Sequence, residues 1–207
     1  NNVVVRSSNY HLYGDMSRRV MTTLKQYIPA IEIYSIDEAF LLLDGYPTDR
    51  LKQLGEDVAR IVRRNTGIPV SIGMSHTKTL AKIASKLCKK YPKLNSACLM
   101  QRPEDIRKVL EKFPIEDVWG IGRRLAPKLQ EKGIRTALDF VERPRDWVND
   151  NLHLPGVRTW EELRGHVCLE EELEERRQSI CTSRSFADMI EDYRNVNNLL
   201  LISNYYK

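Results

Sequence analysis

Residues 31–43 read Ile-Glu-Ile-Tyr-Ser-Ile-Asp-Glu-Ala-Phe-Leu-Leu-Leu. Two strand-forming stretches, 31–36 and 39–43, flank the adjacent carboxylates Asp37 and Glu38, which predicts a β-hairpin around that pair. Two anions about 4 Å apart repel each other by roughly 4 kcal/mol at an effective dielectric constant of about 20. A bound divalent cation would turn that repulsion into attraction. The pair is therefore a candidate metal site, and a plain surface turn is the alternative.

The two carboxylates need a particular geometry to share a metal. Adjacent side chains of a regular strand point to opposite faces, so Asp37 and Glu38 can face one site only at a turn or a strand end. A two-metal phosphoryl-transfer site, with ions about 3.5–4 Å apart, needs more ligands than two carboxylates supply. We therefore expect a third carboxylate from another strand.

Hydrophobic periodicity and turn residues predict a mixed order of elements around this hairpin. The order resembles a split βαβ layout without its first strand, which is where we expect the third carboxylate. From residue 103 the chain changes to short helices broken by Gly and Pro, with a helical pair over 118–140. Besides the hairpin, we expect a strand at 3–5, a helix at 15–28, a helix at 49–65 closed by Gly67, a strand at 69–74, a helix at 77–91 and a sheet-closing strand at 97–100.

The composition is that of an ordinary globular protein with an uneven charge distribution. The chain has 207 residues, 42% of them hydrophobic, and a net charge of +5. No apolar run reaches the roughly 18 residues of a membrane span, and four cysteines without paired spacing fit a reducing cytosol. No acidic residue lies between Asp57 and Glu104, whereas basic residues are frequent there. This asymmetry indicates a polyanionic partner or a solvated basic face.

A stripe of lysines lies on the predicted helix at 77–91. Lys78, Lys82, Lys86 and Lys90 follow each other at a spacing of four residues, and Lys89 lies beside them. Like charges at this spacing destabilise a helix by about 0.2–0.5 kcal/mol per pair, and no acidic residue within the helix offsets them. Such a stripe suits a triphosphate or a nucleic-acid backbone, and a solvated lysine face is the alternative.

Residues 118–134 read Val-Trp-Gly-Ile-Gly-Arg-Arg-Leu-Ala-Pro-Lys-Leu-Gln-Glu-Lys-Gly-Ile. A Gly-x-Gly turn before a helix exposes backbone N–H groups that suit a phosphate. This is the helix-hairpin-helix pattern of sequence-independent DNA binding, and an ordinary helical hairpin is the alternative. Ser183 and Arg184, in a strand expected near 179–186, are weaker phosphate-binding candidates. The candidates in the hairpin are Gly120, Ile121, Gly122, Arg123, Arg124 and Lys128.

Taken together and in this order, the segments resemble the Y-family translesion DNA polymerases, and among them the UmuC-type catalytic subunits of bacterial DNA polymerase V. The resemblance runs to about Tyr193 and so covers nearly the whole chain. It is carried by residues 7–17, 34–39, 78–82, 118–124 and 181–186.

The resemblance implies an α+β fold. A partial ferredoxin-like palm at 1–101 would be followed by a small all-α helix-hairpin-helix thumb at 102–166. An acidic linker at 167–178 would lead to the beginning of an α/β little-finger domain at 179–207. Asp37 and Glu38 would be catalytic and would hold Mg²⁺, and Lys89 and Lys82 would bind the nucleotide. The hairpin residues 120–124 with Lys128, and Ser183 with Arg184, would contact DNA.

The implied activity is template-directed, error-prone DNA synthesis across damaged templates by two-metal nucleotidyl transfer, as in SOS-type repair. The implied partners are primer–template DNA, a deoxynucleoside triphosphate, a processivity clamp, a cleaved accessory subunit and a recombinase filament, without a membrane. The implied location is the bacterial cytoplasm, at the nucleoid. The family's first metal-binding Asp, its steric gate and its fingers have no counterpart in the 207 residues, so we expect an inactive internal fragment.

Two other classes of protein share part of this pattern. A non-catalytic DNA-binding module would use only the lysine helix and the Gly120–Gly122 hairpin. A nucleotide cyclase built on a similar palm would also use paired carboxylates. A cyclase has no need for the glycine hairpin, so that feature argues against it.

Overall fold

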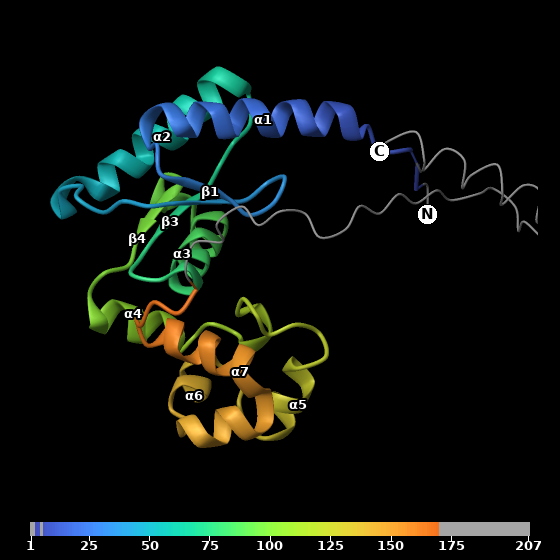
Figure 1. Cartoon of the computed structure of the whole chain (residues 1–207), viewed down its shortest axis with the longest axis vertical. Coiled ribbons are helices and arrows are strands. Elements are labelled where there is room, and N and C mark those ends of the chain that lie inside the picture. Colours follow the sequence, from blue (N-terminus) through green and yellow to red (C-terminus); the bar gives the residue numbers. More distant parts are fainter. Residues whose placement is uncertain (1–2, 5, 170–207) are drawn as a thin grey trace, which may run out of the picture. The chain divides into compact units, whose positions relative to one another are not determined.

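The computed structural model describes residues 3–4 and 6–169, whose arrangement Figure 1 shows. The chain divides into two compact units, Asn1–Glu171 and Glu172–Lys207, and every element below belongs to the first. Ser183 and Arg184, with the expected little-finger start and most of the acidic linker, lie outside the described residues. Among the described residues, none of the helices combines the length and apolarity that a membrane span requires.

Helices and strands are mixed up to residue 101, and helices and turns follow. Val3 and Val4 form no strand, and Val5 lies outside the described residues. The strands are β1 (Ile31–Ile33), β2 (Ala39–Leu41), β3 (Ile72–Met74) and β4 (Ala97–Leu99), each shorter than expected. The helices are α1 (Tyr10–Tyr27), α2 (Leu51–Thr66), α3 (Lys78–Lys90), α4 (Pro103–Leu110), α5 (Ala126–Glu131), α6 (Ala137–Val141) and α7 (Arg145–Leu163), with 3-10 turns at Thr48–Arg50, Pro92–Leu94 and Ile115–Asp117.

The described strands form two separate pairs rather than one sheet. β1 and β2 are antiparallel, with Glu32 opposite Phe40, which confirms the predicted hairpin. β3 and β4 are parallel, with Gly73 opposite Cys98. The expectation that residues 97–100 close a single sheet is wrong within the described part of the chain, because β2 and β3 each have a hydrogen-bonded neighbour on one side only.

Helices cover both faces of the β3–β4 pair (Figure 1). Gly55 brings α2 close to one face, since a Cβ there would lie 2.8 Å from Met74 Cε and 3.0 Å from Ala97 Cβ. Gly73 faces the other side, where a Cβ would collide with the backbone of α3. α1 and α2 form a core with both strand pairs, in which Val62 is fully buried. The strands therefore lie between α1 and α2 on one side and α3 on the other.

The ends of α1 and α2 follow from short-range signals. α2 ends before Gly67, as predicted, because the left-handed φ of 76° at this glycine lets its N–H donate to Arg63 O at 2.8 Å. α1 begins at Tyr10, before the expected start at residue 15, because Asn9 Oδ1 accepts the Leu12 N–H at 3.0 Å. Periodicity misses these first turns because their apolar side chains are exposed.

Residues 102–169 form a helical region that shares one core with α3. Ile115, Ile134 and Phe140 are fully buried in it. Leu80 and Ile83, which come from α3, belong to the same apolar cluster. The helix carrying the lysine stripe is therefore packed between the β3–β4 pair and the helical region.

The predicted helical pair over residues 118–140 is present as α5 and α6, but its first helix starts late. Residues 118–125 form a loop, and α5 begins at Ala126. Pro127 lies in the first turn of α5. Backbone N–H groups there have no acceptor within the helix, so the missing N–H of proline costs no hydrogen bond. Gly133, with a φ of 79°, makes the turn between the two helices.

A reciprocal cap begins α6. Thr136 Oγ1 accepts the Asp139 N–H at 3.1 Å, and Asp139 Oδ2 accepts the N–H groups of Thr136 and Arg135 at 2.9 Å. Burial alone would raise the pKa of Asp139, but these N–H donors hold that pKa below its usual value. The stability from this cap is therefore present above the unfolded-state pKa and is lost as the pH falls through the folded-state pKa.

The last helix, α7, bends in its middle. His153 has a φ of 57°, outside the helical range, and Pro155, two residues later, cannot donate a backbone N–H to the preceding turn. The second half of α7 carries Thr159 and Glu162, both buried.

Candidate functional site

The two predicted carboxylates lie on the loop of the β1–β2 hairpin. The N–H groups of Tyr34 and Ser35 both donate to Glu38 O at 3.0 Å, which closes the loop. Both carboxylate side chains are exposed, and Ser35 Oγ donates to Asp37 Oδ1 at 2.7 Å. Glu38 instead accepts hydrogen bonds from Lys82 Nζ at 3.0 and 3.1 Å. The hairpin thus supplies the expected loop position, while the two carboxylates bind different partners.

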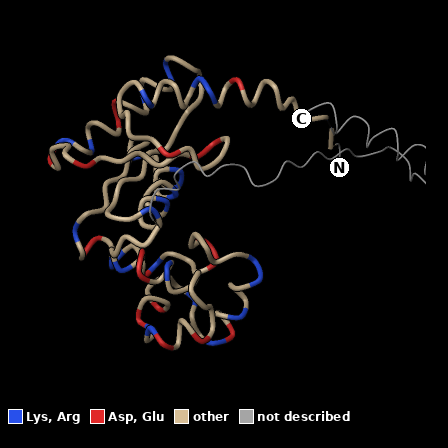
Figure 2. The backbone as a smooth tube through the Cα atoms, viewed as in Figure 1, with Lys and Arg blue, Asp and Glu red and all other residues tan. Residues whose placement is uncertain are grey.

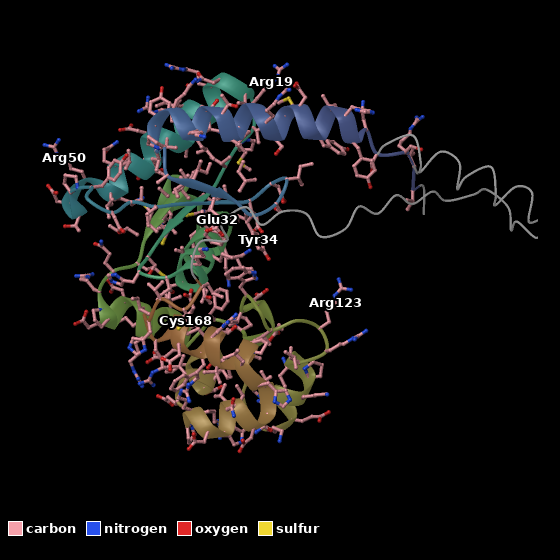
Figure 3. All side chains as sticks on the ribbon, viewed as in Figure 1. Arg19, Glu32, Tyr34, Arg50, Arg123 and Cys168 are labelled. Atoms are coloured by element: carbon pink, nitrogen blue, oxygen red, sulfur yellow. The ribbon has the colours of Figure 1, made fainter. Side chains whose placement is uncertain are left out.

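The lysine stripe of α3 finds its acidic partners in other elements. Lys78 pairs with Glu32 of β1 at 2.6 Å, Lys82 with Glu38 at 3.0 Å, and Lys86 with Asp117 at 2.9 Å. The repulsion among these lysines is therefore offset by acidic residues of other elements, which the fold brings next to α3. Figure 2 shows basic residues on the segment that Figure 1 labels α3, and in Figure 3 Glu32 and Tyr34 lie near the same helix.

Lys89, the predicted triphosphate contact, differs from these three lysines. Its side chain is exposed and makes no ion pair with any described residue. Seven residues separate it from Lys82, so both lie on one face of α3 about 10 Å apart along the helix axis. Lys89 and the Lys82–Glu38 pair therefore belong to one surface.

Three aromatic rings join the hairpin to the helical region. The Trp119 ring centroid lies 5.3 Å from that of Tyr34 and 5.6 Å from that of Phe40. Lys82 Nζ lies 4.7 Å from the Trp119 centroid and 5.0 Å from the Tyr34 centroid, within cation–π range. This cluster is absent from the sequence prediction. The tryptophan in the glycine-rich turn is the one sequence feature that points to this cluster, and it does not indicate which rings Trp119 contacts.

Replacing Trp119 by alanine is expected to lower the free energy of unfolding by about 2 kcal/mol, since aromatic pairs contribute about 0.5–1.5 kcal/mol each beyond burial. Urea unfolding measures this loss. Amide exchange in residues 31–41 should also become faster. Trp147→Ala is the matched control, because this ring lies against Lys132 and Arg143 of the helical region. If amide exchange in the β1–β2 hairpin were equally fast in both variants, the contact of Trp119 with Tyr34 and Phe40 would be contradicted.

The loop at 118–125 is held by buried apolar residues and presents backbone N–H groups without acceptors among the described residues. Val118 and Ile121 are buried, and the Ile121 N–H donates to Val118 O at 3.0 Å. The N–H groups of Gly122, Arg123 and Arg124 make no hydrogen bond with any described residue. Three free donors in one exposed loop suit a phosphate group.

Glycine is required at position 120 by backbone and packing together. Gly120 has a φ of 90°, and a Cβ there would lie 2.5 Å from Thr159 Oγ1 of α7. The cationic side chains Arg123, Arg124 and Lys128 are exposed and form no ion pair with described residues. Figure 3 shows Arg123 pointing away from the helices. The hairpin residues predicted to contact DNA therefore lie together on this loop and the start of α5. Ile121 is buried beneath the loop, and the others are exposed.

The donor set for a metal is of the right chemical kind but incomplete. Carboxylates are ligands that Mg²⁺ prefers, and Asp37 and Glu38 supply two of them from an exposed loop. No group of three or more His, Cys, Asp or Glu side chains suited to a metal occurs among residues 3–4 and 6–169. The expected third carboxylate is not among the described residues.

The fold is similar to that of Y-family DNA polymerases of known structure. A Y-family polymerase chimera of Dbh and Dpo4 superposes with a TM-score of 0.67 at 22% identity, covering 81% of this chain and 48% of that one. DinB from Sulfolobus solfataricus gives a TM-score of 0.64 at 24% identity, covering 77% of this chain and 46% of that one. At these identities the likeness establishes the α+β fold.

In sequence, two parts of the chain match models of the impB/mucB/samB family. Residues 1–86 match the model of this family, and residues 103–134 match its helix-hairpin-helix motif. UmuC of Salmonella typhimurium is 43% identical over 92% of this chain and 46% of the relative. SamB of the same organism is 36% identical over the same shares. A DNA polymerase IV of Desulfatibacillum aliphaticivorans is 32% identical over 74% of this chain and 38% of the relative.

Proposed function

We propose that the chain is part of a DNA-directed DNA polymerase that copies damaged templates with low fidelity by two-metal nucleotidyl transfer. The chain spans about half the length of the curated relatives it matches. The observation that carries the proposal is the contact of Glu38 with Lys82 at 3.0 Å. It brings the carboxylate pair and the lysine face of α3 together, as a site for a metal-bound triphosphate requires.

The described elements would then serve as palm and thumb. Residues 1–101, with the two strand pairs, would be a partial ferredoxin-like palm, and residues 102–166 would be the thumb. The third carboxylate would come from a strand that pairs with β2 or β3, because each has an edge without a described neighbour. Residues 167–178 would link the thumb to a little finger at 179–207, where Ser183 and Arg184 would touch DNA.

The residues of the chain would act mainly by binding and orienting. Asp37 and Glu38 would hold Mg²⁺, which when bound stabilises charge on the attacking and leaving oxygens. Lys82 would exchange Glu38 for a phosphate oxygen of the nucleotide, and Lys89 would bind the same triphosphate about 10 Å further along α3. Positioning and electrostatics supply most of the catalysis in phosphoryl transfer.

The loop at 118–125 would hold the DNA backbone without reading its sequence. Its free N–H groups and the side chains of Arg123, Arg124 and Lys128 suit phosphates, which carry no sequence information. An enzyme that copies varied templates needs such contacts.

The double variant Arg123→Ala/Lys128→Ala is expected to bind primer–template DNA about tenfold more weakly, with a salt slope reduced by about two, one for each lost phosphate contact. Fluorescence anisotropy at several salt concentrations measures both quantities. Lys108→Ala/Lys112→Ala is the control, because it removes the same charge from exposed positions at α4 and just beyond it. If both variants weaken binding equally, the loop has no special role.

We also propose that the 207-residue chain alone does not extend a primer, since its described residues supply only two of the expected carboxylates. A primer-extension assay with Mg²⁺ tests this, and incorporation by the chain alone would overturn it. The alternative function is a non-catalytic DNA-binding module. The exposed cationic loop at 118–125 favours that alternative, because phosphate binding by its N–H groups and arginines needs no metal.

We propose a location and further partners on the basis of the family resemblance alone. The whole protein would work in the bacterial cytoplasm at the nucleoid. It would work on primer–template DNA with deoxynucleoside triphosphates. A processivity clamp, a cleaved accessory subunit and a recombinase filament would be its further partners.

A further inference from the structure

Glu162 is a buried carboxylate that has no place in the proposed chemistry. It lies near the end of α7, is 0% exposed, and forms no ion pair with a described residue. A buried charge is costly unless hydrogen bonds satisfy it. Its partners therefore indicate what the residue does.

Backbone N–H groups from two separate segments satisfy this carboxylate. Oε2 accepts the N–H of Thr79, in the first turn of α3, at 2.9 Å. Oε1 accepts the N–H groups of Cys168 at 2.9 Å and Leu169 at 3.2 Å, just after α7. A carboxylate at a helix N-terminus is also favoured by the helix dipole. Figure 3 shows Cys168 beside these helices.

The main chain of Glu162 holds the same turn of α3. Thr77 Oγ1 donates to Glu162 O at 2.8 Å and accepts the Leu80 N–H at 3.3 Å as the N-cap of α3. The side chain and the carbonyl group of one residue thus both bind the start of this helix. We call these contacts the Glu162 joint.

The same face of α7 also supports the loop at 118–125. Thr159 lies three residues before Glu162, so both project from one side of the helix. Thr159 Oγ1 is the atom that a Cβ at Gly120 would meet at 2.5 Å. α7 therefore contacts the loop at 118–125 through Thr159 and α3 through Glu162.

We propose that Glu162 is a positioning residue that fixes α3 relative to the loop at 118–125, so that the lysines of α3 and the donors of the loop form one phosphate-binding surface. The inference rests on the proposed function only for the identity of the ligand. Glutamine is a poor substitute, because its amide group would turn a donor toward a backbone N–H. Both carboxylate oxygens of Glu162 are thus needed as acceptors in the joint.

The first measurement uses the chain without DNA. In Glu162→Gln, amide hydrogen exchange is expected to become faster at residues 79–82, 118–125 and 168–169. Thr77→Val removes the hydroxyl group that donates to the carbonyl oxygen of Glu162. It should produce the same pattern of exchange, but more weakly. Val148→Ala is the control, since this fully buried residue of α7 lies outside the joint. Exchange that rises evenly across the helical region in all three variants would overturn the proposal.

The second measurement is binding of fluorescein-labelled primer–template DNA at a temperature where the variants are folded. Glu162→Gln should weaken binding about fivefold, within the range of coupling between distant sites, and Val148→Ala should leave it unchanged. Unchanged affinity in Glu162→Gln, although Arg123→Ala/Lys128→Ala weakens binding, would overturn the positioning role. If the unaltered chain does not bind DNA, the proposed function fails, and hydrogen exchange alone decides whether the joint fixes the loop.

Discussion

Replacing Asp37 by alanine is expected to reduce Mg²⁺-dependent nucleotide incorporation about a thousandfold, in a polymerase that contains this chain. A metal contributes several kcal/mol to transition-state stabilisation, and about 4 kcal/mol corresponds to this factor. The free energy of unfolding should stay nearly unchanged, because Asp37 is exposed and its described hydrogen bonds go only to Ser35. Single-turnover incorporation and urea unfolding measure the two quantities.

Two further variants separate catalysis from DNA binding. Asp44→Ala removes the same charge from an exposed position after the hairpin and should keep full incorporation. Lys128→Ala should weaken DNA binding while incorporation at saturating DNA stays high. If Asp37→Ala retained incorporation, the pair would not be catalytic and the non-catalytic DNA-binding module would become the better assignment.

Local signals suffice for the hairpin and for the end of α2. The residues at 31–43 alternate strand formers around a polar turn, and Gly67 tolerates a left-handed φ of 76°, so both features follow from short-range geometry. The late start of α5 has an equally local cause in Pro127, which marks the first turn of a helix. The sequence prediction missed that signal by starting the helical pair at Val118.

Contacts between distant segments could not be predicted in this way. Lys82 and its partner Glu38 lie 44 residues apart, and Thr79 and Glu162 lie 83 residues apart. No periodicity links such positions, because their contact depends on how whole elements pack. For this reason the sequence shows only that the lysine stripe lacks acidic partners within its own helix, whereas in the structure three of its members pair with acids from other elements. The roles of the site residues stay predictions.

Replacing Gly73 by alanine is expected to lower the free energy of unfolding by about 3 kcal/mol, at the upper end of overpacking costs. A Cβ at this position would collide with Ala81 O and Ser85 N, which are backbone atoms of α3 and cannot rotate away. α3 would have to move off β3, and Leu80 and Ile83 would lose part of their burial. Urea unfolding measures the loss.

The same shift should loosen the site, because α3 also carries the ion pairs of Lys78 with Glu32 and Lys82 with Glu38. Amide exchange of the β1–β2 hairpin should therefore become faster in Gly73→Ala. Gly14→Ala is the control: nothing lies within 4 Å of its added Cβ, and alanine within a helix should stabilise α1 by about 0.5–1 kcal/mol. Unfolding of Gly73→Ala at the urea concentration of the unaltered chain would show that α3 does not pack this closely on β3.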